Sequence, residues 1–534
     1  MSKYIIVTGG GVDNCGKGTT AASLGRLFKN RGIKVSVQKF DPYLNVDPGT
    51  MSPYQHGEVF VTDDGAECDV DMGHYERFLD TNFGKLNNIT AGRLYTAVIN
   101  KERMGKYVGA TVNVIPHVSE EVKNSMIALG NEGHDIVIVE IGGTVNDYET
   151  GVFYHGIRQL MAEVGDENVF LLHVDILPYI FATHESKIDS LQASVQRLNS
   201  HGIMPDAVVC RLVKGSSLSL ETKQRIVKRC FLKGPECVIQ NVDLDTIYEI
   251  PVMLQKEGLD DLILKKFNMN FPKADLNSWN FMVNNFKGNY PEVKVCIVGK
   301  YTKVSDAYMS IEESIKHACT YNQIKAKIEL IDAEDIEEFG VEKFLKGAKA
   351  IIVPPGWGSR GVNGMLESIR YARENKIPYL GIGLGMQMAI IEFGRNVLNL
   401  QSANTTEVDP NTEFPVVDIM AEQKSIVMKG GTMRLGAYNC VLDPDSKARK
   451  LYGKELVSER HRHRYEFNSK FYEKYENAGM NMAGMNPESK LIELIEITDH
   501  PYFVATIFEP DKLSRPNKPH PLFLGLMNTA KSVR

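Results

Sequence analysis

Long hydrophobic runs, paired cysteines and a strong excess of one charge are all missing from this sequence. No stretch approaches the ~20 apolar residues that span a membrane, and the apolar run Tyr4–Val7 is too brief for the core of a signal peptide. The eight cysteines are scattered and none forms a CxxC pair, which argues against a disulfide framework or a zinc site. The formal charge of -6 gives no reason to expect nucleic acid or an anionic membrane as a partner. We therefore expect a cytoplasmic protein with reduced thiols.

The chain is too long for one hydrophobic core. It has 534 residues, whereas single cores rarely grow past roughly 250–300 residues. Its 43% hydrophobic and 24% charged residues are ordinary for a soluble enzyme. Two domains are the expected organisation.

Short apolar runs rich in β-branched residues alternate with longer helical patterns in both halves of the chain. Runs of this kind are buried on both faces, which is typical of a parallel sheet covered by helices. They are Tyr4–Val7, Asp135–Ile141, Val169–Val174, Ala207–Arg211, Lys294–Gly299, Lys325–Ile331 and Ala350–Val353. The pattern predicts an α/β fold with two domains, each a mostly parallel sheet flanked by helices.

The boundary between the domains is expected where the periodicity weakens. After Phe267 a polar stretch runs to Asn289-Tyr290-Pro291, and a new series of apolar runs then begins. We therefore expect a first domain over residues 1–267, a linker over 268–290 and a second domain over 291–534. Active sites should lie at the carboxyl ends of the strands.

A glycine-rich loop follows the first predicted strand and precedes a helical pattern. The spacing Gly11-x4-Gly16-Lys17 fits a phosphate-binding loop, although Gly18 stands where Ser or Thr usually follows the lysine. Backbone N–H groups and the helix N-terminus can hold phosphate there, and Lys17 supplies a mobile cation. The alternative is a plain glycine turn with a solvated lysine. The flanking strand and helix favour phosphate binding.

Two acidic segments could supply magnesium ligands beside that loop. The apolar run that starts at Asp135 ends in Glu140, and the cluster Asp64–Asp71 carries several carboxylates. An acidic loop alone is more often a solvated surface. Next to bound phosphate, however, magnesium is held by one or two carboxylates together with phosphate oxygens and water.

Several long motifs resemble the signatures of CTP synthases, and the likeness covers nearly the whole chain. The motifs are Lys39–Pro53, Gln55–Val61, Gly73–Phe78, Gly430–Gly436 and Arg460–Glu466. The resemblance implies a P-loop synthetase domain followed by a class I glutamine amidotransferase domain. Such an enzyme is an ATP-dependent carbon–nitrogen ligase: ATP phosphorylates the 4-oxygen of UTP, and ammonia then displaces the phosphate to give CTP.

The resemblance also implies site residues and cofactors. Lys17 and Lys39 would be catalytic, with Asp71 and Glu140 as ligands of Mg2+, which suits a reaction whose catalysis is mostly positioning and charge neutralisation. ATP would contact Asn14, Cys15, Gly16, Lys17, Gly18, Thr19, Asp71, Arg211, Asp243 and Leu244. UTP or CTP would contact Asp13, Asp147, Tyr148, Glu149, Lys187, Gln192 and Lys223.

The second domain departs from its family at the positions that hydrolyse glutamine. An amidotransferase of this class needs a cysteine nucleophile, a histidine base and an orienting glutamate, but the matching positions are Gly383, Glu509 and Asp511. The oxyanion loop reads Pro355-Gly356, and proline has no N–H to donate to an oxyanion. We therefore expect an inactive glutaminase, a pseudo-glutaminase that leaves the ligase dependent on free ammonia.

Two residues of the second domain remain candidates for binding glutamine. They are Gln387 and Glu407. Binding alone would release no ammonia.

The first domain departs from the family more gently. Asp13-Asn14 replaces a pair of serines in the phosphate loop, and Asp189 replaces a lysine where the UTP triphosphate is expected. A like charge 4 Å from a phosphate costs up to roughly 4 kcal/mol at intermediate dielectric. Asn113 and Asn146 replace a glutamine and a glycine. These changes predict weakened affinity for UTP.

Two alternatives to an ammonia-dependent synthetase stay open at this stage. A catalytically silent relative could bind nucleotides, regulate an active copy or form filaments, and Asp13 and Asp189 favour it. A P-loop ATPase that acts on another small molecule is the other alternative. The resemblance implies a homotetramer with filaments as a further assembly, and leaves open whether GTP, the family's effector, still binds.

Overall fold

The chain folds into two compact units in the computed structural model, which describes residues 1–180 and 185–533. The first unit comprises Met1–Asp47 and Asp71–Lys287, and the second comprises Pro48–Val70 and Gly288–Arg534. No helix in the described ranges combines the length and apolarity that crossing a membrane requires.

The division differs from the expected one in two places. Pro48–Val70 was expected in the first domain but belongs to the second unit, where Arg460 Nε donates a hydrogen bond of 2.6 Å to Asp63 and Arg462 Nε one of 2.8 Å to Glu67. These side chains are almost 400 positions from their partners, so no local pattern signals the pairing. The expected linker over 268–290 contains helix α11 (Asn277–Phe286), which belongs to the first unit because Trp279 is buried there and its indole N–H donates to Tyr248 O at 2.7 Å.

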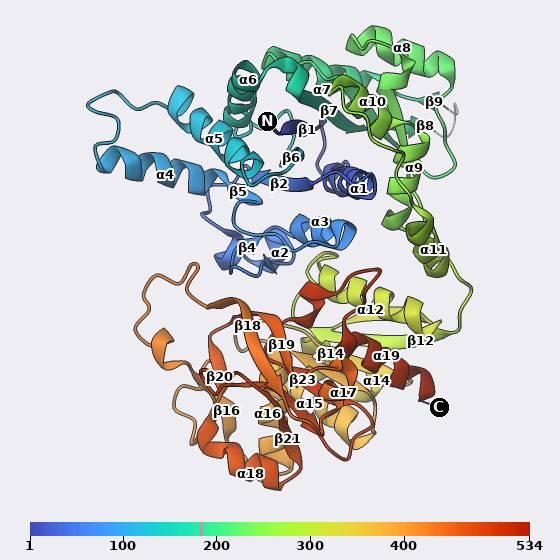
Figure 1. The fold of residues 1–534 in the computed structure, drawn as a ribbon. Helices are drawn as coiled ribbons and strands as arrows, with labels where there is room; N and C mark the ends of the chain where they lie inside the picture. Colours follow the sequence, from blue (N-terminus) through green and yellow to red (C-terminus); the bar gives the residue numbers. More distant parts are fainter. Residues whose placement is uncertain (181–184, 534) are drawn as a thin grey trace. The chain divides into compact units, whose positions relative to one another are not determined.

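The first unit is built on a seven-stranded sheet in which every pairing is parallel (Figure 1). Its central strands are mostly apolar and almost wholly buried, as expected when helices cover both sides. In spatial order the strands are β11 (Val238–Val242), β10 (Ala207–Leu212), β7 (Val169–Ile176), β1 (Lys3–Gly9), β6 (Ile136–Ile141), β2 (Val35–Asp41) and β5 (Asn88–Thr90). Strands β8 (Tyr179–Ile180) and β9 (Glu185–Ser186) pair antiparallel.

Helices flank this sheet. They are α1 (Lys17–Asn30), α3 (Asp71–Leu79), α4 (Ala91–Arg103), α5 (Ser119–Gly130), α6 (Gly151–Val164), α7 (Asp189–Ser200), α8 (Leu220–Cys230), α9 (Ile250–Lys256) and α10 (Leu259–Lys266), together with α11. Helix α1 is almost wholly buried and lies directly against α3: a Cβ on Gly25 would come within 2.6 Å of Leu79. This close packing brings the start of α3 beside the phosphate loop.

The second unit is built on a nine-stranded mixed sheet. Its parallel part is β13 (Lys325–Asp332), β12 (Glu292–Gly299), β14 (Ala350–Val353), β15 (Tyr379–Ile382) and β23 (Phe503–Thr506). The sheet continues antiparallel with β22 (Ile492–Ile497), β21 (Met480–Met485), β18 (Arg434–Leu442) and β19 (Leu456–His463). Two smaller sheets accompany it: β16 (Ala403–Thr405), β17 (Phe414–Ile419) and β20 (Tyr465–Phe467), and the hairpin β3 (Phe60–Val61) with β4 (Glu67–Cys68).

The helices of the second unit are α2 (Pro53–His56), α12 (Met309–Asn322), α13 (Ala333–Phe339), α14 (Val341–Leu345), α15 (Val362–Glu374), α16 (Leu384–Asn396), α17 (Lys447–Tyr452), α18 (Tyr472–Asn477) and α19 (Pro521–Ser532). Helix α15 follows strand β14, and helix α16 follows strand β15. Both helices pack on the sheet through buried apolar residues. The predicted fold class, two α/β domains with parallel strands flanked by helices, is confirmed, and the sheet of the second unit also carries an antiparallel half.

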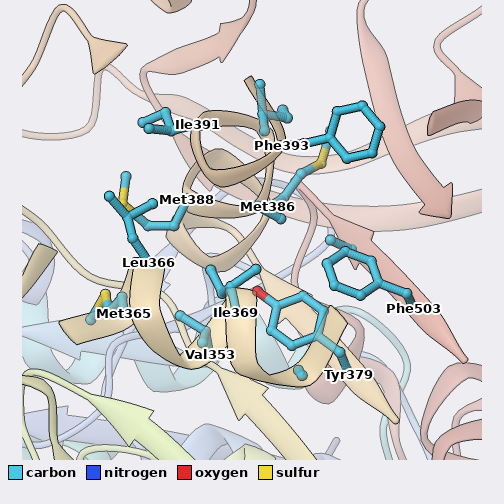
Figure 2. Packing of buried hydrophobic residues seen from close by; sticks show 14 of the residues in the cluster. Val353, Met365, Leu366, Ile369, Tyr379, Met386, Met388, Ile391, Phe393 and Phe503 are labelled. Carbon is cyan, nitrogen blue, oxygen red and sulfur yellow. The ribbon is translucent and has the colours of Figure 1, made fainter. Parts of the chain in front are cut away.

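The core of the second unit supports the turn between β15 and α16. Met386, Met388 and Phe393 of α16 pack among buried side chains from β14, α15 and β23 (Figure 2). Tyr379 stacks on Phe503 with ring centroids 4.5 Å apart, and its hydroxyl donates to Gly385 O at 2.9 Å. A dense apolar cluster therefore supports the turn between β15 and α16.

Candidate functional sites

The phosphate loop of the first unit lies where strand β1 ends and helix α1 begins. The loop closes through Asn14 and Gly16, whose φ angles of 57° and 93° place both residues in the left-handed region. Lys17, the first residue of α1, donates from Nζ to Gly143 O at 2.8 Å. Gly143 follows the end of β6, so the lysine lies at the carboxyl edge of the parallel strands. That edge is where ligands bind in this class of sheet.

A second lysine at the same edge stands between two carboxylates. Lys39 lies in β2 directly opposite Glu140 of β6, and its Nζ pairs with Glu140 Oε1 at 3.1 Å and with Asp71. Tyr75 of α3 donates its hydroxyl proton to the other oxygen of Glu140. The structure therefore brings together Lys39, Asp71 and Glu140, which the sequence separates by up to 101 positions.

The two carboxylates respond oppositely to this environment. Burial opposes ionisation of Asp71, but Lys39, His74 and Lys17 overcome it and lower the pKa of Asp71 to about 2. Burial raises the pKa of Glu140, against the pull of Lys39. Asp71 is thus a firmly ionised group at the opening of the site, and Glu140 is a fully buried one whose charge depends on the cations around it.

Asp71 also explains the unusual Gly18. A Cβ built on Gly18 would lie 2.5 Å from Asp71 Oδ1, so the space in which a Ser or Thr side chain would begin is filled by this carboxylate. The close packing of α1 on α3 produces this arrangement. The Asp71 carboxylate thus leaves no room for the Ser or Thr side chain that usually follows the lysine of a phosphate loop.

The residues fit a magnesium ion held jointly with phosphates. In the described part of the chain no three His, Cys, Asp or Glu side chains are grouped so that they could hold a metal by themselves. Asp71 and Glu140 provide two carboxylates, which suits Mg2+ because this ion takes one or two carboxylates and fills its remaining positions with phosphate oxygens and water.

The predicted adenine-side residues lie next to the phosphate loop. Arg211, near the end of β10, donates from Nε to Asp243 at 3.0 Å and from Nη1 to the carbonyl of Asn14 at 2.9 Å. Cys15 is buried, which raises the pKa of its thiol, and Thr19 Oγ1 donates to Gly16 O at 3.2 Å. Leu244 follows Asp243 and is half-buried.

The predicted pyrimidine-nucleotide residues are more dispersed. Asp147 Oδ2 accepts a 2.6 Å hydrogen bond from Thr144 N, beside Gly143. Lys223 of α8 pairs with Glu257 at 2.9 Å. The remaining members are the exposed Asp13, Tyr148 and Glu149 and the half-buried Lys187 and Gln192.

Asp189 is paired, which changes its expected effect on a triphosphate. Its Oδ1 accepts a 2.5 Å hydrogen bond from Arg229 Nη1, and both side chains are substantially exposed. Arg229 lies on α8, 40 positions away, so the sequence pattern did not signal it. The repulsion expected from Asp189 is therefore partly neutralised.

In the second unit, the elbow between β15 and α16 retains its backbone geometry without a side chain. Gly383 has φ 55° and ψ -107°, and its N–H donates to Thr506 O at 2.7 Å. A Cβ at this position would meet Pro355 at 3.5 Å, an ordinary contact. The elbow thus has room for a side chain, and the strained φ is the only obstacle to one. At this position glycine offers no nucleophile.

Carboxylates and a lysine occupy the place of the expected base. Glu509 and Asp511 follow strand β23 and are buried together with Lys512. Lys512 Nζ lies 2.9 Å from Asp511 Oδ2, 3.4 Å from Glu509 Oε2 and 2.8 Å from Glu58 Oε1. Glu58 also accepts hydrogen bonds from the backbone N–H and hydroxyl of Ser310.

Burial governs the titration of this group. It raises the pKa of Glu509 to about 7 and also raises that of Asp511, while Lys512 opposes both shifts. Glu58 behaves differently, because Lys512 and Ser310 outweigh its burial and lower its pKa. At neutral pH Glu509 is partly protonated, and no imidazole stands in its place.

A pocket of about 60 Å³ opens onto these groups within the second unit. Tyr301, Tyr308 and Trp357 supply aromatic walls, and Pro355 and Gly356 form part of its rim. The acidic and basic residues that line it are Glu58, Arg462, Glu509, Asp511 and Lys512.

The loop after β14 is fixed by a buried lysine. Lys300 Nζ donates to the carbonyl of Trp357 at 3.0 Å and to that of Gly358, and burial lowers the pKa of Lys300 to about 8. Glu407 accepts a 2.8 Å hydrogen bond from Gly358 N. Gln387 donates to Tyr465 O at 3.2 Å, and its buried Oε1 accepts no hydrogen bond from the described residues.

Sequence reasoning missed three residues of this site: Glu58, Lys300 and Lys512. Lys512 directly follows Asp511, so its adjacency to the altered run was a usable signal. Lys300 comes immediately after the predicted strand Lys294–Gly299, where the carboxyl-edge rule would have pointed to it. Glu58 carries no such signal, because its partner lies 454 positions away.

Together the two units define a class of protein: a P-loop ligase unit joined to a unit of the class I amidotransferase type. The family model described as CTP synthase N-terminus matches residues 3–269, and the model for glutamine amidotransferase class-I matches residues 303–529.

The comparison with curated proteins extends over both units. The chain is 51% identical over 524 residues to a CTP synthase of Carboxydothermus hydrogenoformans, with 98% of this chain and 97% of that protein covered. It is 49% identical over 534 residues to a CTP synthase of Clostridium acetobutylicum, with 100% and 99% covered. The solved glutaminase domain of a Trypanosoma brucei CTPS with bound acivicin is 34% identical, with a TM-score of 0.43, covering 45% of this chain and 95% of that one. The chain belongs to the CTP synthase family.

Proposed function

We propose that this protein is an ATP-dependent ligase that aminates UTP to CTP with free ammonia as the nitrogen donor. The observation that carries the proposal is the group formed by Lys17, Lys39, Asp71 and Glu140 at the carboxyl edge of the first sheet. Membership of the CTP synthase family supports the choice of UTP as the substrate.

The residues of the first unit can divide the work of phosphoryl transfer. Lys17 and Lys39 neutralise charge on the transferred phosphoryl group while the 4-oxygen of UTP attacks it, and ammonia then displaces phosphate from carbon 4. Tyr75 and Lys39 hold Glu140 in place. Asp71 and Glu140 would hold Mg2+, which when bound would neutralise negative charge on the phosphates.

The nucleotide contacts that the sequence predicts are part of this proposal. Arg211 donates hydrogen bonds to both Asp243 and the phosphate loop. These contacts fix Arg211 in position for binding ATP. Asp147, held by Thr144 N, together with Lys187 and Gln192, would bind the pyrimidine nucleotide.

Three features of the second unit support the use of free ammonia. Gly383 provides no thiol, Glu509 provides a carboxyl group with a pKa of about 7 in place of an imidazole, and Pro355 lacks the N–H that an oxyanion needs. Each change removes a different step of glutamine hydrolysis, so no single reversal would restore it.

A catalytically silent, regulatory or filament-forming relative is the second candidate. Asp13 favours it, because this exposed carboxylate lies in the phosphate loop. Asp189 was the second residue that favoured a silent relative, but its ion pair with Arg229 weakens that argument. We therefore rank the active ligase first.

Family membership also supports three finer proposals. We expect a homotetramer that can extend into filaments, and we expect the protein to reside in the cytoplasm. If GTP binds, it would have no glutamine hydrolysis to activate. Sedimentation of the full chain with and without ATP and UTP tests the assembly.

The direct experiment measures CTP formation from UTP, ATP and magnesium with either ammonium or glutamine. Turnover with ammonium alone is the expected result. Turnover with glutamine would contradict the assignment of the second unit, and failure with both donors would favour the silent relative.

A further inference from the structure

The pocket of the second unit carries more negative than positive side chains. Three buried acidic side chains, Glu58, Asp511 and the partly protonated Glu509, share the single ammonium group of Lys512. The other cation of the pocket, Arg462, is already paired with the buried Glu67 at 2.8 Å. An uncompensated carboxylate in a buried site is costly, so the pocket favours an additional cation.

One oxygen of this group points to where that cation would bind. Asp511 is 2% exposed, lines the pocket and uses Oδ2 for Lys512, while its buried Oδ1 has no hydrogen-bond partner among the described residues. A buried acceptor without a hydrogen-bond partner is unusual in folded proteins. A bound donor in the pocket would satisfy this oxygen. The carboxyl group of Glu509 lines the same pocket.

The size and lining of the pocket select a small donor cation. Its volume of about 60 Å³ exceeds the ~10–15 Å³ that one water molecule requires, so a few water-sized species fit. Tyr301, Tyr308, Val59 and Ile311 make much of the wall aromatic or aliphatic. Ca2+ and Mg2+ take six or more oxygen ligands, and the described residues hold no cluster of three metal-binding side chains.

We propose that this pocket is an ammonium-binding site, in which Asp511 Oδ1 and the Glu509 carboxyl group accept hydrogen bonds from the ion. The inference rests on the proposed use of free ammonia, and gives the inactive amidotransferase unit a role as a reservoir for the nitrogen donor. Glu509 and Asp511 stand where hydrolytic residues are expected, and they would bind ammonium, the product of glutamine hydrolysis.

The first test is binding, which needs no turnover. Thermal unfolding of the full chain is followed in ammonium, potassium and tetramethylammonium chloride at equal ionic strength. Ammonium should raise the melting temperature more than either other cation, because potassium donates no hydrogen bonds and tetramethylammonium neither donates them nor fits. Equal stabilisation by potassium would overturn the assignment to ammonium.

The second test uses variants. Asp511→Asn should abolish the ammonium-specific stabilisation and raise the KM for ammonium about tenfold, the effect of one charge-assisted hydrogen bond, with kcat at saturating ammonium retained. Glu509→Gln should act in the same direction and serves if Asp511→Asn does not fold. Asp335→Asn, at an exposed position of α13, removes the same charge and should leave both quantities unchanged.

The outcomes separate the two proposals. If CTP forms from ammonium but neither variant alters its KM, the ammonium site is wrong and the ligase stands. If no CTP forms, the ligase is wrong, and the cation-specific stabilisation still decides whether the pocket binds ammonium.

Discussion

The two candidate sites occupy the same position in their sheets but differ in how their charges are matched. In the first unit Lys17 and Lys39 face Asp71 and Glu140, two cations beside two carboxylates. In the second unit the elbow carries no side chain at Gly383, and three acidic side chains share Lys512. The first arrangement is suited to a polyphosphate with its metal, and the second is suited to a small cation.

This difference shows that the fold and the chemistry of an α/β unit depend on different residues. The core beneath the elbow, with Tyr379 stacked on Phe503 and Met386 buried beside them, is complete although the position above it is a glycine. Packing depends on dozens of apolar contacts, whereas hydrolysis depends on a few side chains at the strand ends. The fold of the second unit therefore does not depend on a side chain at position 383.

Removing the Lys17 side chain should give the largest change in the activity of the first site. Lys17→Ala should lower CTP formation from ammonium by about 10²–10³-fold, because a preorganised charge at the transferring phosphoryl group is lost. Steady-state rates of CTP formation check this, with Lys34→Ala at an exposed position as the control. A rate equal to that of the control would show that the first site has been placed wrongly.

Adding a side chain at the elbow tests the second site through stability. Gly383→Ala should destabilise the protein by about 1–3 kcal/mol, because φ 55° with ψ -107° is strained for any residue with a Cβ. Chemical denaturation measures the change, and ammonium-dependent activity should persist. Gly430→Ala, where a Cβ would meet only Thr50 at 3.8 Å, should stay within about 0.5 kcal/mol. A fully stable Gly383→Ala variant would mean that the elbow is relaxed.

The raised pKa of Glu509 predicts a pH-dependent difference between the wild type and Glu509→Gln. Between pH 4.5 and about 7 the unfolded chain releases this proton while the folded chain retains it, so the wild type loses stability relative to the variant as the pH rises. The charged groups facing Glu509 are Lys512, Asp511, Arg462 and Glu58.

The difference should reach about 1 kcal/mol or more, since each pKa unit corresponds to about 1.4 kcal/mol. Melting temperatures of both proteins across this range provide the measurement. Parallel pH profiles would mean that Glu509 titrates normally.

The smallest expected effect concerns the pair between Asp189 and Arg229. Asp189→Lys releases Arg229 and adds a cation near the expected triphosphate, so the KM for UTP should fall about threefold, as befits an exposed pair worth less than about 1 kcal/mol. The dependence of the rate on UTP concentration measures it, with Asp166→Lys as the control. An unchanged KM would place the triphosphate away from α7.

The sequence allowed the fold class and the strands that carry the first site to be predicted. Apolar runs such as Asp135–Ile141 are visible because most positions of a doubly covered strand are apolar. The phosphate loop was predictable because its spacing is local. The hydrolytic positions Gly383 and Glu509 were predictable only through family resemblance, since a glycine and a glutamate signal nothing by themselves.

The remainder depends on pairings between distant residues. Pro48–Val70 joins the second unit through Arg460 and Arg462, and Asp189 is balanced by Arg229 on another helix. The occupation of the Gly18 side-chain space by Asp71 follows from how tightly α1 packs on α3. No periodicity encodes contacts of this kind, because each is decided by tertiary packing.

Under the proposed function, this ligase takes its nitrogen from free ammonia and not from glutamine. The most direct measurement supplies amide-15N-labelled glutamine together with unlabelled ammonium, ATP, UTP, GTP and magnesium, and determines the isotope at the new amino group of CTP by mass spectrometry. CTP that carries no label is the expected result. Labelled CTP would show that the second unit still hydrolyses glutamine and would contradict the roles given to Gly383, Glu509 and Pro355.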